Sequence, residues 1–470
     1  MIRQVSGITT RPVSATFDLR QLLAWASSTR GIWTIWGVTR VLMFINLVIG
    51  AHYCDPQFYQ YAGDLAVGKL PYVNVPVEYP PLAMLFLLLP ALPLLPFGAI
   101  APQPAHITSP LYPDSLRYGA YGISFAICML IVDALTLMLV LRVARRWTIG
   151  DAQGRWSGLI YVGLGMASGA VLQKFDLAVG TLTLLAIVLL LEKRDGWAWA
   201  CLALAALTKG YPALLAPIFI MWTLSNNRFD WNAIRRSVIG GGTACAMLIA
   251  PIMLASGITP LLHSILYHAD RGVEIESTWA ALMLGVGWLP HMDISTFLSA
   301  GDLSLDIHSP LEDPFSRLAV PTMLLLTAAL YWQFWRRLRK AQTYVQANTR
   351  STVATERIMF TYLVHGSLAV MLVFILTFRA FPIHYMLAIV PLIAVLRLPD
   401  GTQLRWMTVL VLGMVFGEFA VTAWDPIIAL VPTADLLLIV RNALIVVACV
   451  LLVRAPLEQL WQTPSRKWAA

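Results

Sequence analysis

The chain has 470 residues, of which 58% are hydrophobic and 12% are charged, with a mean hydropathy of +0.71. Soluble domains carry about 25% charged residues, so this composition excludes a soluble globular protein and predicts an integral membrane protein. The net charge of +8 does not indicate nucleic-acid binding, because the basic residues form short clusters between apolar segments, as they do in membrane proteins.

Apolar segments recur along the whole chain, and many approach the ~20 residues with which an α-helix crosses a bilayer. They run roughly over residues 33–51, 81–101, 118–141, 156–172, 177–191, 196–207, 211–224, 237–256, 279–290, 318–335, 358–378, 382–397, 406–424 and 436–453. Some are too short to cross alone, which is typical of broken or re-entrant segments. The predicted fold class is all-α: a polytopic membrane protein of one domain with about 11–13 crossings.

Basic clusters orient the chain. They lie at residues 142–155, 228–236 and 336–340, and the N-terminus is also basic. By the positive-inside rule these regions are expected to be cytoplasmic, so the loops at 53–80, 257–278 and 291–317 face outward. The first 30 residues lack the apolar core of a signal peptide, and we expect the first span to remain as an anchor in the cytoplasmic (inner) membrane.

Segment 81–101 leaves one topological question open. If it crosses the membrane, the cluster at 142–155 lies outside, against the positive-inside rule. The segment contains Pro81, Pro90, Pro93 and Pro96, and prolines break helices. Either this segment is broken or re-entrant, or the basic cluster violates the rule.

The first outer loop begins with YCDPQFYQYAGDLAVGKLPYVNVPVEYPP, residues 53–81. Apolar residues at 58, 61, 62 and 65 have helical spacing and predict a short amphipathic helix that starts at Asp55. Asp followed by Pro is also an ordinary helix cap, and the tyrosines, Tyr59 among them, are compatible with an interfacial aromatic belt. Glu78 lies just before the next apolar segment, on the same side. Two carboxylates at a membrane interface suit proton abstraction, because partial burial makes a carboxylate a better base.

The second outer loop, LLHSILYHADRGVEIESTWAALM at residues 261–283, has a second amphipathic face followed by charged residues. His268, Arg271, Glu274 and Glu276 are concentrated there. Arginine binds phosphate through bidentate hydrogen bonds, so this loop suits an anionic head group. The alternative is a solvated loop held together by salt bridges.

Isolated charges also interrupt the apolar segments. Lys174, Asp176, Lys209, Arg379 and His384 are of this kind. A charge at the bilayer centre costs ~2.5–3.5 kcal/mol on insertion scales, so such residues usually line a cavity or lie at the end of a span. Two more, Arg40 and Asp133, receive no role, and Arg40 is expected to snorkel toward the interface.

Several stretches together resemble one family. DPQFYQYAGDLAVGKLPYVNVPVEYPPL is similar to the first outer loop of polyprenol-phosphate-mannose-dependent α-1,2-mannosyltransferase-like proteins, glycosyltransferase family 87, which have the C-type glycosyltransferase fold. KFDLAVGTLTLLAIVLLL, LTKGYPALLAP and RGVEIESTWAALM resemble later stretches of these proteins. The resemblance covers residues 53 to about 285. It divides the domain into a catalytic half, 31–290, and variable C-terminal helices, 291–470.

The resemblance implies a multi-helix membrane glycosyltransferase that takes its sugar from a polyprenyl phosphate on the outer side, and we expect the displacement at the anomeric carbon to be inverting. Asp55 matches the family's catalytic base. The family often shows Ser-Pro-Gln-Tyr late in the chain, whereas residues 381–391 read FPIHYMLAIVP, with His384 in place of Gln. Mannose is therefore only the default sugar.

The resulting hypothesis assigns a role to each candidate residue. Asp55 deprotonates the acceptor hydroxyl. The donor phosphate is expected to be bound by Arg271, His268, Lys209 and His384, and the sugar or a lipid or glycan acceptor by Glu78, Tyr59, Glu274 and Glu276. No metal site is predicted, although a divalent metal is compatible with the chemistry. The rival hypotheses are a lipid or glycan transporter and a structural membrane subunit without catalysis.

Overall fold

A computed structural model describes residues 19–51, 53–75, 77–98, 100, 115–148, 154–227, 230–259, 262, 271–287, 293–298, 304–348 and 352–462. His268 and most of the amphipathic face predicted at 261–268 lie outside these residues, so the predictions made for them are not tested.

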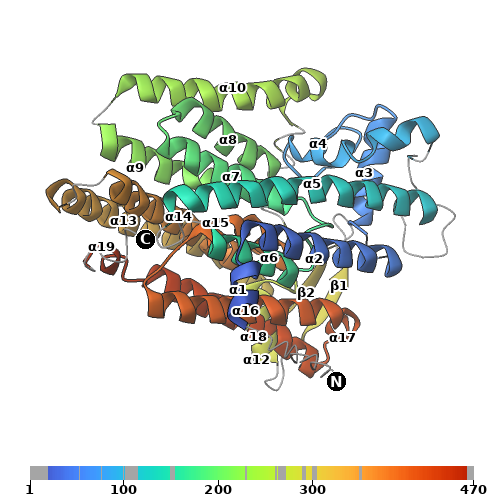
Figure 1. Cartoon of the computed structure of the whole chain (residues 1–470). Helices are drawn as coiled ribbons and strands as arrows, with labels where there is room; N and C mark the ends of the chain where they lie inside the picture. Colours follow the sequence, from blue (N-terminus) through green and yellow to red (C-terminus); the bar gives the residue numbers. More distant parts are fainter. Residues whose placement is uncertain are drawn as a thin grey trace, which may run out of the picture.

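The described chain is almost entirely helical (Figure 1). The helices of the first half are α1 (Leu19–Ala26), α2 (Thr29–Ile49), α3 (Pro56–Ala66), α4 (Ala83–Leu88), η1 (Leu92–Phe97), α5 (Ser115–Trp147), α6 (Arg155–Ala167), α7 (Asp176–Leu191), α8 (Asp195–Thr208), η2 (Tyr211–Leu215), α9 (Ala216–Asn227) and α10 (Trp231–Ser256). The second half contains α12 (Thr278–Gly287), β1 (Ser295–Leu298), β2 (Leu305–His308), α13 (Glu312–Asn348), α14 (Thr352–Thr377), η3 (Ile383–Ala388), α15 (Val390–Val395), α16 (Asp400–Thr422), α17 (Trp424–Ile428), α18 (Pro432–Val453) and α19 (Gln459–Gln462).

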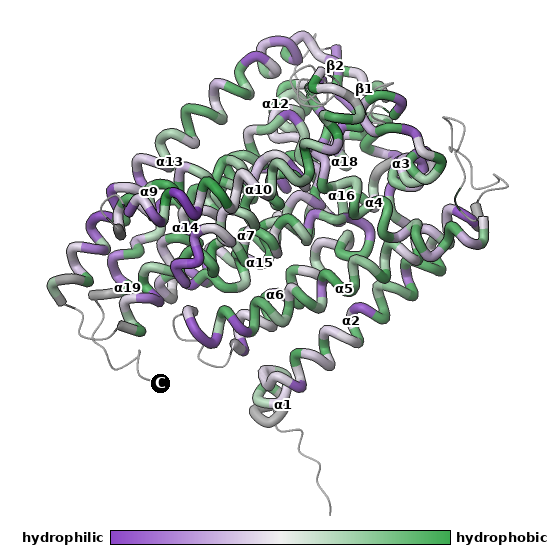
Figure 2. Tube along the Cα trace, turned by 90° about the horizontal axis from the view of Figure 1, so that it is seen from above, coloured by the Kyte–Doolittle hydropathy of each residue, from purple (hydrophilic) through white to green (hydrophobic). Residues whose placement is uncertain are grey.

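The predicted fold class is confirmed: the protein is an all-α, polytopic membrane protein. In the described ranges, seven helices are long and apolar enough to span a membrane, namely α2, α5, α10, α13, α14, α16 and α18. Their hydrophobic middle stretches give way to hydrophilic residues toward several of their ends (Figure 2). Shorter apolar helices, α7 and α12 among them, lie between the long ones, and the count of 11–13 crossings stays a prediction.

The long helices differ in how much of their surface other helices cover. The apolar stretch of α14 is 94% buried, whereas that of α10 is 6% buried. On α10 the side chains of Met247 and Leu254 are largely exposed. An apolar surface of this kind is stable only against lipid or a partner, so α14 forms the centre of the bundle and α10 its lipid-facing edge.

Segment 81–101 is broken, as one of the two alternatives predicted. The helix α4 is only six residues long, and the 3₁₀ helix η1 follows it after Pro90. Neither is long enough to cross a bilayer. A segment that does not cross would let α5 carry Arg142, Arg145 and Arg146 to the side opposite the end of α2, as the positive-inside rule requires, and this topology stays a prediction.

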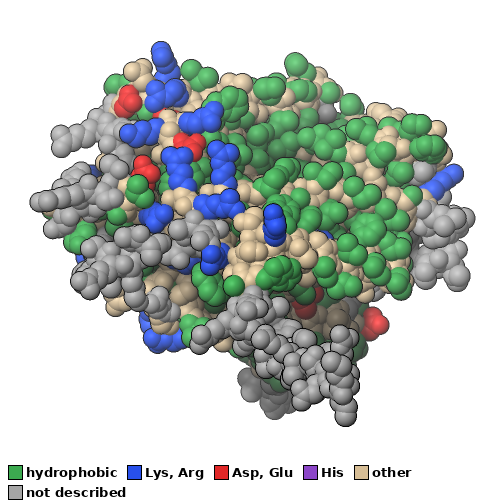
Figure 3. All heavy atoms as spheres, in the orientation of Figure 1, with side chains coloured by type: hydrophobic (Ala, Val, Ile, Leu, Met, Phe, Trp, Pro, Cys, Tyr) green, Lys and Arg blue, Asp and Glu red, His purple; other side chains and the backbone are tan. Residues whose placement is uncertain are grey.

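The basic clusters at 142–155 and 228–236 meet at the turn between α7 and α8, where Arg236 of α10 lies 2.8 Å from the Asp195 carboxylate. The Arg146 guanidinium at the end of α5 lies 3.1 Å from the Glu192 carboxylate that follows α7, and the Arg357 side chain of α14 donates to the Arg146 carbonyl over 3.3 Å. Figure 3 shows Lys and Arg side chains gathered on the left of the view, beside a broad hydrophobic band. The opposite end holds α3 and α4 (Figure 1).

A small hairpin fixes the second outer loop. Strands β1 and β2 pair antiparallel, with Ser295 opposite His308. The chain after residue 271 runs along β2, because the Ile275 amide donates to the Leu305 carbonyl and the Ile307 amide donates to the Val273 carbonyl, each over 2.9 Å. The described end of the loop at 257–278 is therefore held in place by backbone hydrogen bonds.

Candidate functional site

The helix α3 starts where the sequence predicts, with Asp55 at its N-cap position. Asp55 precedes Pro56, and its carboxylate makes no hydrogen bond to the helix. It binds the Lys174 ammonium group instead, across the loop between α6 and α7. Asp55 therefore occupies the cap position, as the alternative interpretation predicted, but its side chain is engaged by Lys174 and not by the helix. The carboxylate is left accessible: the Asp55 side chain is 39% exposed and that of Lys174 is 16% exposed.

The ion pair determines the charge of Lys174. Burial alone lowers the pKa of a lysine, because it disfavours the charged form. The charge and hydrogen bond of Asp55 outweigh this effect, so the pKa of Lys174 is raised. The ammonium group is therefore charged, and it is available to a second anion beside Asp55.

A second and more deeply buried pair lies next to the first. The Lys209 ammonium group, at the end of α8, lies 2.7 Å from the Asp176 carboxylate at the start of α7, and the two side chains are 9% and 1% exposed. Aromatic rings surround the ammonium: it is 4.4 Å from the ring centre of Tyr385, 5.3 Å from that of Phe175 and 6.0 Å from that of Tyr79. The charge of Lys209 is thus paired with Asp176 and enclosed by aromatic rings. The Lys174 side chain is the more solvent-exposed of the two lysines.

Arg271 lies on a rigid part of the second outer loop. Its guanidinium donates to the Ser304 hydroxyl over 2.8 Å and lies 3.5 Å from the Glu274 carboxylate. Its carbonyl accepts a hydrogen bond of 2.9 Å from the Arg379 guanidinium, and the Arg379 carbonyl accepts from the Glu274 amide over 3.0 Å. These contacts join the second outer loop to the chain that follows α14.

Glu276 is held inside the protein. Its carboxylate lies 3.0 Å from the guanidinium of Arg441, a fully buried residue of α18. The same guanidinium donates to the Glu276 carbonyl over 2.8 Å and also to the Phe381 carbonyl. This arrangement fixes the second outer loop to α18. Glu276, which was predicted to bind the sugar or the acceptor, binds Arg441 inside the protein.

His384 connects the two outer loops. Burial lowers its pKa well below the usual value, and the nearby charges of Lys174, Lys209, Arg271 and Arg441 lower it further. The His384 imidazole therefore lies close enough to feel the charges of both Lys174, which binds Asp55, and Arg271 on the second outer loop. The ring is neutral at pH 7 and retains one N–H donor.

Glu274 differs from the other carboxylates of the site. Burial raises its pKa to about 8, with Arg271 lowering it and Glu276 and Asp306 raising it. One carboxylate oxygen, Oε2, is buried and has no hydrogen-bond partner among the described residues. A protonated carboxyl group at this position can donate a hydrogen bond to a ligand hydroxyl.

The predicted candidates do not all come together. Asp55, Lys209, Arg271, Glu274 and His384 belong to one charged cluster, and Glu78 acts on the same region because its charge affects Tyr79 and Tyr385. We call this group, with Lys174 and Asp176, the loop cluster. Tyr59 does not belong to it: its side chain is fully buried, with ring centres 5.5 Å from Tyr121 and 6.1 Å from Tyr118. Tyr59 packs in the aromatic core beneath α3.

Sequence reasoning missed three contributors. Lys174 was noted as an interrupting charge but not as the partner of Asp55, and the roles of Arg379 and Arg441 in fixing the second loop were not predicted. The signal that could have found them is the rule that a buried charge needs a counter-charge or several hydrogen bonds. Both halves of the chain supply the loop cluster, since His384 and the anchoring Arg441 come from the second half.

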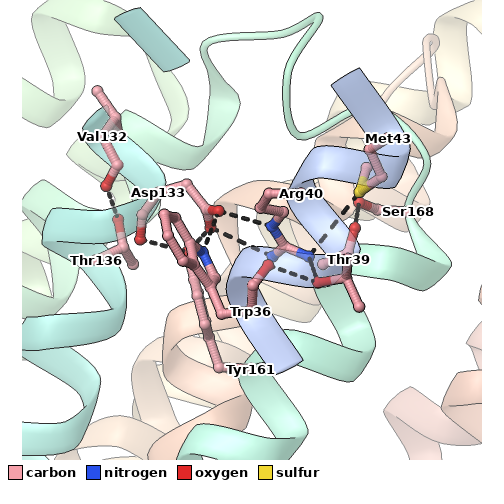
Figure 4. Close-up of polar contacts among 10 residues, drawn as sticks. Trp36, Thr39, Arg40, Met43, Val132, Asp133, Thr136, Tyr161 and Ser168 are labelled. Carbon is pink, nitrogen blue, oxygen red and sulfur yellow. Dashed lines mark hydrogen bonds and ion pairs between the residues drawn. The ribbon is translucent and has the colours of Figure 1, made fainter. Parts of the chain in front are cut away.

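Another buried ion pair lies away from the loop cluster (Figure 4). The Arg40 guanidinium of α2 lies 2.7 Å from the Asp133 carboxylate of α5, and both side chains are almost completely buried. The carboxylate also accepts hydrogen bonds from Trp36 and Tyr161. The expectation that Arg40 snorkels toward the interface is therefore wrong, because its charge is paired inside the protein.

The fold and the loop cluster define the class as a polytopic α-helical membrane protein with a charged site at one end. In the part of the chain that the structure describes, no three His, Cys, Asp or Glu residues lie together as a metal site would require. Neither the models of known protein families nor the curated proteins contain a match to this sequence.

Proposed function

We propose that the protein is a membrane glycosyltransferase that moves a sugar from a polyprenyl phosphate to a lipid or glycan acceptor. The family resemblance makes mannose the default sugar and the extracytoplasmic side the default face. One observation carries the proposal: Asp55, the candidate base, is paired with Lys174, and the charges of Lys174, Lys209 and Arg271 from both outer loops all act on the buried His384 ring.

The ion pair of Asp55 suggests how the base becomes available. Lys174 binds the Asp55 carboxylate. A lipid phosphate that enters beside Lys174 competes with the Asp55 carboxylate for its ammonium group, because both anions accept hydrogen bonds from the same N–H donors. Asp55 is then released to accept the proton of the acceptor hydroxyl, which is a poor nucleophile until a base removes that proton.

The cations have the complementary task. The leaving phosphate gains negative charge as the bond to the sugar breaks, and preorganised donors stabilise that charge best. Arg271 offers a planar guanidinium whose position Ser304 and the backbone contacts of Arg379 fix. The neutral His384 ring supplies an N–H donor without adding another charge to the cluster.

Two carboxyl groups are suited to the hydroxyl groups of a sugar or acceptor. Glu274 has an unpartnered oxygen and a raised pKa of about 8, so it is a hydrogen-bond donor at neutral pH. Glu78 lies just before the broken segment α4–η1. That segment is too short to cross the bilayer, and we propose that a long prenyl chain enters from the membrane beside it.

The test is transfer by purified protein in lipid nanodiscs, with a radiolabelled polyprenyl-phosphate sugar and a panel of lipid and glycan acceptors. We expect Asp55→Asn to lower turnover by about 10²–10⁴-fold, the usual contribution of a general base. The matched control is Asp64→Asn, on the same helix and in a separate ion pair with Lys69. Transfer by Asp55→Asn at the rate of the control would remove Asp55 from the chemistry.

The same preparation distinguishes the proposal from transport. If the protein is a transporter, sugar lipid crosses vesicle membranes and the phosphate–sugar bond stays intact. The enzyme releases polyprenyl phosphate in proportion to sugar transferred. Movement of intact donor, with no released lipid phosphate for any acceptor, would overturn the proposed function.

A further inference from the structure

A long groove lies between α12, α13, α14 and α18. Its volume is about 780 Å³, and most of its wall is apolar. On α13 the lining residues extend from Thr322 to Lys340, which is about 27 Å at 1.5 Å per residue. The groove therefore runs along nearly the ~30 Å thickness of the hydrocarbon core of a bilayer.

The two ends of the groove differ in charge. One end is formed by Thr278, Trp279 and Thr377, where the Trp279 indole donates to the Thr377 carbonyl over 2.9 Å. The other end contains four basic side chains and one acidic one: Arg336, Arg337, Lys340, Arg454 and Glu458. An apolar channel that ends in a basic cluster is complementary to a molecule with an apolar tail and an anionic head.

Arg337, at the basic end of the groove, has a guanidinium nitrogen that lacks a hydrogen-bond acceptor in the described part of the chain. Its side chain is half-buried, and its Nη1 is buried without a hydrogen-bond partner among the described residues. The described residues also provide no carboxylate within ion-pair distance of it. Arg337 also lines the groove, and its charge lacks a counter-ion among the described residues, so an anionic head group in the groove would supply one.

We propose that this groove binds an anionic phospholipid, with its phosphate at Arg336, Arg337 and Lys340 and its acyl chains along α13 and α18. A water-soluble anion would leave the apolar wall empty, and a lipid without net charge would leave the cations unpaired. Anionic lipids of the cytoplasmic leaflet attract basic residues at the membrane surface, and the positive-inside rule places this cluster in that leaflet.

This lipid is distinct from the proposed sugar donor. Arg379 joins the loop cluster to the other end of α13, because its guanidinium donates to the Arg271 carbonyl over 2.9 Å and to the Ser316 carbonyl over 2.8 Å. From Ser316 to Arg337 the helix rises about 30 Å. One phosphate cannot bind at both ends, so the inference does not depend on the proposed function.

The test uses protein in detergent to which phosphatidylglycerol or phosphatidylcholine is added, with bound lipid counted by native mass spectrometry. We expect preferential retention of phosphatidylglycerol, and about five-fold weaker binding for each charge removed in Arg337→Gln and in Arg336→Gln/Lys340→Gln. The control is Arg235→Gln/Arg405→Gln, which removes two exposed basic residues of α10 and α16 outside the groove. Equal losses in the control would show non-specific attraction and overturn the proposal.

A second variant tests the apolar part of the site. Ala329 is exposed to the groove, so Ala329→Trp fills its middle and leaves every charge in place. We expect phosphatidylglycerol retention to fall several-fold while elution volume and Tm stay at the wild-type values. Glycerol phosphate, which has the head-group charge but no chains, should not displace the lipid. Undiminished retention by Ala329→Trp would show that the chains do not lie in the groove.

Discussion

Two ion pairs in this protein show the difference between a structural and a chemically available charge. Arg40 and Asp133 are 2% and 0% exposed, and neighbouring donors bind the carboxylate (Figure 4). Asp55 and Lys174 form an equally direct pair at the loop cluster, but their side chains are 39% and 16% exposed. The first pair has no room for another partner, whereas the second is accessible to one.

The surroundings explain why both pairs exist in such an apolar chain. An ion pair inside a membrane protein is retained only if hydrogen bonds offset the cost of removing both charges from water. Trp36 and Tyr161 provide such bonds for Asp133. Asp55 receives one cation and remains partly solvated, which is the state expected of a group that must exchange partners during a reaction.

The largest expected effect is on the enclosed pair. Asp133→Asn leaves the Arg40 charge buried without a counter-charge, and breaking a buried pair in this way costs about 3–5 kcal/mol. We expect a strong loss of thermal stability and of folded yield in detergent. The double substitution Arg40→Met/Asp133→Leu removes both charges and should recover most of the loss. Equal stability of Asp133→Asn and wild type would contradict a structural role for this pair.

The second prediction concerns Arg271, whose guanidinium is held in position by Ser304 and Glu274. Arg271→Gln removes a charge-assisted hydrogen bond to the proposed donor phosphate, worth about 1.5–3 kcal/mol, or roughly 10–100-fold in kcat/KM for the donor. The backbone contacts of residue 271 remain, so Tm should change little. The control is Arg317→Gln, whose side chain is fully exposed on α13. Donor kinetics unchanged by Arg271→Gln would remove its phosphate role.

The third prediction tests whether the accessible pair is exchangeable. Lys174→Gln should lower turnover by about ten-fold, because the donor phosphate loses the cation that it shares with Asp55. The cost in stability should stay below about 1 kcal/mol, since partly exposed pairs contribute little. Lys174→Arg keeps the charge and should restore part of the activity. A large fall in Tm with normal turnover in the folded fraction would make this pair structural, like that of Arg40.

The sequence was sufficient to predict most of the helices and several residues of the loop cluster, Asp55, Arg271 and His384 among them. Apolar runs of about 20 residues predict spanning helices because the bilayer sets their length, and the spacing of residues 58, 61, 62 and 65 predicted α3. The prolines at 90 and 93 predicted the break after α4, because proline ends a helix. These features depend on local chemistry.

The remaining features depend on contacts between distant segments. Arg441 lies in an apolar run and looks like any interrupting charge, and its partner Glu276 is 165 residues away. Asp55 and Lys174 are 119 residues apart. The hairpin β1–β2 escaped prediction because each strand has only four residues, too few for an alternating pattern.

The smallest effect expected is a pH dependence of stability from Glu274. Its folded-state pKa is raised to about 8 from the usual 4.5, so the folded protein holds a proton that the unfolded chain releases. This contribution to stability is fully present below the unfolded pKa and is lost as pH rises through about 8. Glu274→Gln should reduce the fall in Tm between about pH 6 and about pH 9 by an amount on the order of 3 °C. The control Asp313→Asn removes an exposed carboxylate and should retain the wild-type slope. If Glu274→Gln has that slope as well, the carboxyl group of Glu274 is ionised in the folded protein, and it cannot be the hydrogen-bond donor that distinguishes it from Asp55.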